Sequence, residues 1–245
     1  MNYKEYRFST WEILQIILGT MVITITISFL FYRSLWGCLL FPFVYTVMWK
    51  VINNHKIEQR TKLLKEQFLN GMRVLNSSIQ AGLSMENSWK EVEKETGLMY
   101  GKQSLFYREV KEMNHQVSLN IPIEKLFLEF GYRTEQEDMI HFAEILDYGK
   151  RTGGDWKKII DVTVYRMSEK QDAQKEIEVM VAAKKMEQKV MSVIPLGMLA
   201  FLQISSWEYM AVLYHNPLGI ICMSVCLIGY AGALFLARKM LQIKV

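Results

Sequence analysis

Two short segments contain the residue types of a phosphate-binding loop. Gly101–Ser104 reads GKQS, and Gly149–Thr152 reads GKRT. A phosphate loop needs an upstream glycine, the order Gly-Lys-Ser/Thr and a preceding strand, and neither segment has these features. Gly153 and Gly154 precede a predicted helix and could bind an anion through free N–H groups. A turn between two helices explains the same residues better.

Two other groups of residues could bind a metal ion. His141 shares a helical face with Glu137 and Glu144, but a carboxylate-bridged site would need matching Glu and His residues from other helices. Those residues are missing, so we expect a solvated or partner-facing polar patch. Cys222 and Cys226 also share a face, without a second pair to complete a site, and are expected to be small packing residues in the membrane. No nucleophile-elbow sequence is present. We therefore predict no catalytic, cofactor-binding or metal-ligating residue, and a protein that is not an enzyme.

The charged residues are concentrated in the middle of the chain. Residues 53–189 hold 22 basic and 22 acidic side chains, whereas the other 108 positions hold 7 and 3. This pattern excludes a simple one-core soluble enzyme, a disordered chain and a basic nucleic-acid binder. It indicates a membrane protein with one water-soluble insert.

Four apolar segments are predicted to cross the membrane: Ile13–Tyr32, Leu35–Ile52, Val190–Met210 and Pro217–Ala237. An α-helix needs about 20 residues to cross about 30 Å of hydrocarbon, and only the second segment is marginal in length. Helices are expected because every backbone polar group in lipid needs an internal partner. Of the 29 Lys and Arg residues, only Arg33 falls in an expected external connection. The positive-inside rule therefore puts both termini and the middle domain in the cytoplasm.

The middle domain begins with a long predicted helix. Its apolar residues recur at steps of three and four along one helical face, and they are Leu64, Phe68, Met72, Leu75 and Ile79. The helix is expected to end at Ala81-Gly82, where glycine can adopt the left-handed conformation. Ser84 is expected to cap a second helix that stops near Thr96-Gly97, and a third helix covers about 103–117.

Three further signals divide the rest of the domain. Asn120–Pro122 predicts a turn, with Pro122 in the first turn of the next helix. Thr134 and Glu137 predict a capping box, and Asp155 is expected to cap a long last helix. Several methionines are either core residues or an adaptable surface for a partner helix: Met99, Met113, Met139, Met167, Met180 and Met186.

The predicted fold class is an all-α membrane protein. Four transmembrane helices would enclose one cytoplasmic six-helix bundle between the second and the third. The last helix of the bundle is expected to continue into the third span, where Pro195 would kink it. The predicted domains are a membrane pair over 1–52, the cytoplasmic helical domain over 53–189, and a second membrane pair with a short tail over 190–245.

Several of these segments resemble the type II secretion system F domain family. The stretch Gln67–Glu95 is similar to the first half of that domain, with a helix, an Ala-Gly turn, a Ser cap and an amphipathic helix. The second half is similar at Pro122-Ile123-Glu124, at Tyr132-Arg133-Thr134, over Asp147–Asp155 and at Val193-Ile194-Pro195. The end of the chain, Asn216–Gly219 and Met240–Val245, resembles the tight-adherence (Tad) branch.

This resemblance implies a non-enzymatic platform protein in the bacterial cell (inner) membrane, part of a Tad-type pilus or a type II-like secretion machine. Such platforms lie above a hexameric cytoplasmic ATPase and help to lift pilin subunits out of the membrane. The implied partners are that ATPase, pilin transmembrane helices, the lipid bilayer, and a paralogous platform protein or a second copy. The alternative is a membrane-anchored helical scaffold or signalling protein unrelated to pilus assembly.

Overall fold

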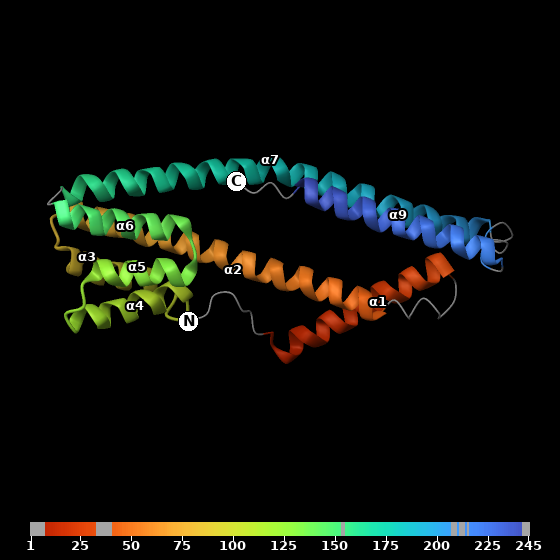
Figure 1. The fold of residues 1–245 in the computed structure, drawn as a ribbon, viewed down its shortest axis with the longest axis horizontal. Coiled ribbons are helices and arrows are strands. Elements are labelled where there is room, and N and C mark those ends of the chain that lie inside the picture. The colour runs from red at the N-terminus through yellow and green to blue at the C-terminus, as the bar shows by residue number, and fades with distance from the viewer. Residues whose placement is uncertain are drawn as a thin grey trace. The chain divides into compact units, whose positions relative to one another are not determined.

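The computed structural model describes residues 8–32, 41–152, 155–206, 210, 214 and 216–241. Every regular element among them is a helix (Figure 1), so the all-α prediction is confirmed for this part of the chain. The helices are α1 (Thr10–Tyr32), α2 (Phe41–Gln80), α3 (Met85–Tyr100), α4 (Leu105–Ser118), α5 (Ile123–Thr134), α6 (Glu137–Thr152), α7 (Trp156–Ser205) and α9 (Pro217–Leu241).

The described residues divide into two compact units. The first unit contains residues 54–173, and the second contains residues 8–53 together with 174–241. Both α2 and α7 contribute to each unit. The predicted domain borders at 52/53 and 189/190 therefore fall inside continuous helices.

The core of the first unit takes residues from every helix from α2 to α7. All five residues of the predicted stripe on α2 are buried there. Phe68 lies at the centre, with its ring 5.9 Å from that of Phe106, 6.1 Å from Phe130 and 5.8 Å from Phe142. Edge-to-face and tilted pairs of this kind are the favoured aromatic geometries. This aromatic cluster joins α2 to α4, α5 and α6.

The turn between α2 and α3 confirms two predictions. Gly82 has φ +94°, its N–H donates to the Ile79 carbonyl, and the Leu83 N–H donates to the Ser78 carbonyl. These two bonds form a Schellman motif, which satisfies carbonyls at the end of α2. Ser84 then caps α3, because its hydroxyl accepts the Asn87 N–H at 3.3 Å.

Two predicted helix boundaries are wrong. The helix that begins after Ser84 continues past Thr96-Gly97 to Tyr100, since Thr96 is buried and bonds back to Val92 O within the helix. Thr134 does not cap α6 but is the last residue of α5. Its hydroxyl is directed back along α5, where it donates to Phe130 O at 3.0 Å, and the backbone N–H groups of Met139 and Ile140 in α6 donate to the Gln136 carbonyl instead.

The start of α7 follows the prediction where the structure describes it. Asp155 accepts the Lys157 N–H at 3.1 Å, and Ile160 and Val164 are buried in the core. The predicted turn glycines Gly153 and Gly154 lie outside the described residues. As expected, α7 then continues as one helix through Pro195 to Ser205.

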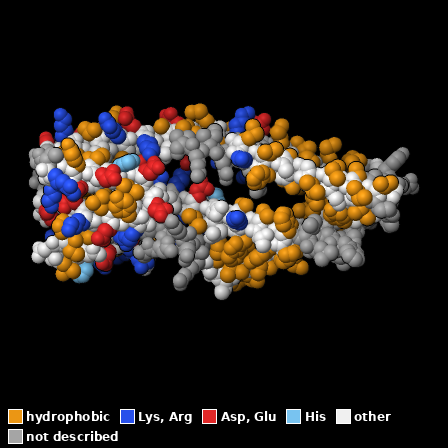
Figure 2. Space-filling view, viewed as in Figure 1, with side chains coloured by type: hydrophobic (Ala, Val, Ile, Leu, Met, Phe, Trp, Pro, Cys, Tyr) orange, Lys and Arg blue, Asp and Glu red, His pale blue; other side chains and the backbone are white. Residues whose placement is uncertain are grey.

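Three helices in the described part of the chain are long and apolar enough to cross a membrane: Thr10–Tyr32, Lys157–Ser205 and Leu218–Ala237. The chain is thus a membrane protein by length and composition of its helices. Of the second predicted span, residues 35–40 lie outside the described residues, and 41–52 form the start of α2. Figure 2 shows charged side chains over the helices of the first unit and hydrophobic side chains dominating α1 and α9.

Candidate interaction surfaces

The two segments that resemble phosphate loops have structural roles at helix ends. Gly101 follows α3 with φ +78°, and its N–H donates to the Gly97 carbonyl. Ser104 caps α4 by accepting the Tyr107 N–H at 3.3 Å. Gly149 and Lys150 lie within α6. Neither segment forms an open cradle of backbone N–H groups.

The two groups of residues that were considered as metal ligands lie on exposed helix faces. His141 Nδ1 lies 3.3 Å from Glu144 on the exposed side of α6. Cys222 and Cys226 are free thiols on the exposed side of α9. Within the residues that the structure describes, no group of three or more His, Cys, Asp or Glu side chains could hold a metal ion.

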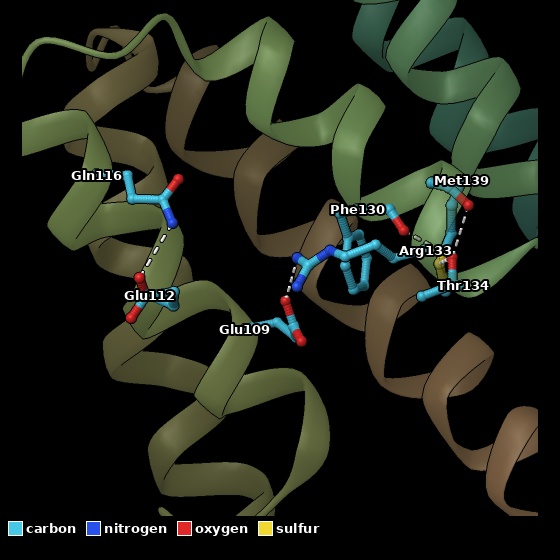
Figure 3. Close-up of polar contacts among 8 residues, drawn as sticks. Glu109, Glu112, Gln116, Phe130, Arg133, Thr134 and Met139 are labelled. Carbon is cyan, nitrogen blue, oxygen red and sulfur yellow. Dashed lines mark hydrogen bonds and ion pairs between the residues drawn. The ribbon is translucent and has the colours of Figure 1, made fainter. Parts of the chain in front are cut away.

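Three ion pairs join successive helices of the first unit. Arg133 of α5 pairs with Glu109 of α4 at 2.6 Å, as Figure 3 shows. Lys150 of α6 pairs with Glu124 of α5 at 2.9 Å. Lys170 of α7 pairs with Asp138 of α6 at 2.6 Å. These pairs fix the order and register in which α4, α5, α6 and α7 pack.

The carboxylates of the first two pairs are buried, although their cationic partners are partly exposed. Glu109 is 4% exposed and Glu124 is 6% exposed. Transfer of a carboxylate out of water is costly, so each needs its cation. These pairs cannot be predicted from local spacing, because the partners lie 24 and 26 residues apart in the sequence.

Two grooves on the first unit could receive a partner. The first, which we call the basic groove, has a volume of about 930 Å³ and runs over α3, α4 and the end of α5. The second, the α6–α7 groove, has a volume of about 650 Å³. Its apolar lining includes Phe142, Ile145, Ile159 and Val162. The two grooves therefore differ in chemistry, one being charged and the other largely apolar.

The side chains near the basic groove include one exposed pair with a shifted titration. Lys94 donates to Glu91 at 2.7 Å one turn away on α3. This hydrogen bond and the Glu91 charge raise the pKa of the Lys94 ammonium above its ordinary value. The pair is solvated, so it orders the surface of α3 without a large effect on stability.

The methionines fall into both predicted groups. Met113 and Met139 are buried in the core of the first unit, and Met167 packs against it. Met99, Met180 and Met186 are exposed. The exposed three are available to a partner, whereas the buried ones act as core residues.

The second unit contains a polar cluster at the end of α1. Gln203 of α7 donates to the carbonyls of Phe29 at 3.2 Å and Leu30 at 2.9 Å. The Tyr214 hydroxyl also donates to Leu30 O, at 2.7 Å. These hydrogen bonds join Gln203 and Tyr214 to the end of α1.

No model of a known protein family, no curated protein and no solved structure matches this chain. The structure defines the class of this chain as an all-α membrane protein. Its charge-rich helices pack around a hydrophobic core of their own. Its most distinctive features are the ion pairs between neighbouring helices and the two grooves on the first unit.

Proposed function

We propose that this chain is a platform protein in the cell membrane of a bacterium, in a Tad-type pilus or a type II-like secretion machine. In this role it couples a cytoplasmic hexameric ATPase to the movement of pilin subunits, and it is not itself an enzyme. Four spans hold the chain in the membrane, and both termini lie in the cytoplasm with a six-helix bundle between the second and third spans. The family resemblance of Gln67–Glu95 and of Asp147–Asp155 is the origin of this proposal.

The observation that carries the proposal is the continuity of α7. This helix contributes Ile160 and Val164 to the core of the first unit and continues as one helix, with Pro195 inside it, to Ser205. A continuous helix can pass a displacement along its axis, since its backbone hydrogen bonds run parallel to that axis. A protein that transmits motion from a separate motor needs such an element. The ion pairs between α4, α5, α6 and α7 support this role, because they join the surface helices to α7.

Co-purification tests the partner. The full chain, extracted from bacterial membranes in a non-ionic detergent, is expected to retain a hexameric secretion ATPase. The purified chain alone is expected neither to bind nor to hydrolyse ATP. Saturable ATP binding by the chain would contradict the platform role. Retention of other membrane or signalling proteins without the ATPase would favour the scaffold alternative.

Cysteine labelling tests the topology. Lys125 and Asn216 are both exposed, the first on α5 and the second just before α9. In intact cells a membrane-impermeant maleimide is expected to label Asn216→Cys but to label Lys125→Cys only after lysis. The unsubstituted chain, with its own cysteines Cys38, Cys222 and Cys226, gives the background. Labelling of Lys125→Cys in intact cells would place the first unit outside, where no intracellular motor could reach it.

A further inference from the structure

The basic groove has an excess of positive charge that the protein itself does not neutralise. Five basic and three acidic side chains line it. Glu109 is paired with Arg133 at 2.6 Å, whereas Glu93 and Glu112 accept neutral amide donors, from Asn114 at 2.7 Å and from Gln116 at 3.0 Å, and stay charged. Figure 3 shows the first and third of these contacts. Four Lys and Arg side chains then face two charged carboxylates.

The remaining cations of the groove are exposed and lack a partner. Lys90, Lys102, Arg108 and Lys111 make no ion pair or side-chain hydrogen bond with the residues that the structure describes. Each is exposed to solvent. Clustering of like charges raises the local potential, which favours association with a molecule of opposite charge.

The arrangement of these cations distinguishes between two kinds of anion. A phosphate group is best held by donors that converge on one point, commonly the free N–H groups at a helix N-terminus. At the start of α4 these groups are occupied, because Tyr107 N–H donates to the Ser104 hydroxyl and Phe106 N–H to the Gln67 side chain. The cations instead lie on α3, in the α3–α4 connection and along α4. Charges spread over two helices fit carboxylates spaced along a polypeptide.

We propose that the basic groove docks an acidic segment of a protein partner, with Asp or Glu side chains spaced to meet Lys90, Lys102, Arg108 and Lys111. The half-buried ring of Tyr107 lines the same groove and offers an apolar contact to that segment. Charge complementarity sets the rate and the specificity of docking more than its final affinity. The inference goes beyond the platform role and does not depend on it.

The test uses the full chain in non-ionic detergent micelles and a fluorescent poly-L-glutamate peptide as the probe. The groove variant replaces Lys90, Lys102, Arg108 and Lys111 with Gln. The control variant replaces four exposed cations of the same unit outside both grooves, Lys62, Lys125, Arg151 and Lys157, with Gln. Both variants lose the same net charge. Circular dichroism melting of each variant checks that it is folded.

The groove variant is expected to bind the peptide about tenfold more weakly, because each exposed pair contributes little and four act together. The control variant is expected to stay within about twofold of the parent chain, and the parent affinity to fall as salt is added. Equal losses in both variants, or no binding by the parent, would overturn the proposal. Displacement of the peptide by inorganic triphosphate at equal charge concentration would also overturn it, in favour of a phosphate site. A negative result here leaves the ATPase co-purification unaffected, so the two proposals fail separately.

Discussion

Arg133 reaches from α5 to within 2.6 Å of Glu109 on α4, and the carboxylate is 4% exposed while the guanidinium side chain is 41% exposed. The two partners therefore differ in how deeply they are buried. Loss of Arg133 removes the cation 2.6 Å from a buried carboxylate, whereas neutralisation of Glu109 leaves a cation that water can solvate. We expect the two substitutions to have different effects on the free energy of unfolding.

Arg133→Met is predicted to lower the free energy of unfolding by about 1–3 kcal/mol, a value reduced from that of a fully buried pair because Arg133 is partly solvated. Glu109→Gln should lower the free energy of unfolding by less than Arg133→Met does. The double variant should lose less free energy of unfolding than the two single variants lose together, since the residues contact each other. Thermal melting in detergent measures all three. A larger loss for Glu109→Gln than for Arg133→Met would refute the unequal-burial argument.

Gly71 is predicted to be intolerant of alanine, although Gly to Ala in a helix interior normally gains about 1 kcal/mol. A Cβ at this position would lie 2.8 Å from Cζ of Phe106, whose ring is 1% exposed. Such overpacking costs about 1–3 kcal/mol, so the net effect of Gly71→Ala should be destabilising. Ser77→Ala, at an exposed position of the same helix, is the control and should change the melting temperature little. A raised melting temperature for Gly71→Ala would show that the ring can move.

Ser88→Ala is predicted to stabilise the first unit. The Ser88 hydroxyl is fully buried on α3 and has no hydrogen-bond partner among the residues that the structure describes. Removal of an unsatisfied buried polar group recovers about 1 kcal/mol of desolvation, and Ala is also the better helix former. Ser77→Ala again serves as the control, since its hydroxyl is exposed and bonded to Val74 O. A lower melting temperature for Ser88→Ala would mean that the hydroxyl has an important partner.

Gln203→Leu is predicted to weaken the second unit by removing donors to the carbonyls of Phe29 and Leu30. Side-chain hydrogen bonds between membrane helices contribute about 0.6 kcal/mol on average and up to about 1.7. We expect a loss within this range, measured as earlier unfolding when a denaturing detergent is titrated into the micelles. Met198→Leu, an exposed position on the same helix, should unfold like the parent chain. Equal unfolding of the two variants would show that the hydrogen bonds from Gln203 to α1 do not stabilise the second unit.

Local patterns in the sequence were sufficient for much of the fold. The stripe from Leu64 to Ile79 is buried as predicted, and Gly82 and Ser84 end one helix and begin the next. These features depend on residues within one or two turns of each other, where backbone conformation and helical periodicity decide the outcome. The apolar lengths of α1 and α9 could be recognised for the same reason.

Helix boundaries predicted from neighbouring residues were wrong where a tertiary contact favoured a different boundary. Thr134 and Glu137 have the spacing of a capping box, but the hydroxyl of Thr134 is buried and bonds within α5 and to Met139 Sδ at 3.3 Å. Thr96 and Gly97 look like a helix end, yet α3 continues to Tyr100, with Thr96 buried and the Tyr107 ring of α4 close to Gly97. Packing energy outweighs a weak local signal in both cases.

The chain's order of residues was enough to establish its helices, its apolar segments and its charged middle. Only the folded arrangement decided that Glu109 pairs with Arg133, that Glu124 pairs with Lys150, and that Gln203 donates to the Leu30 carbonyl of α1. The reason is physical: helix formation is governed by neighbours along the chain, whereas burial of a charge is governed by whichever helix lies across from it. No periodicity in one segment carries information about that second helix.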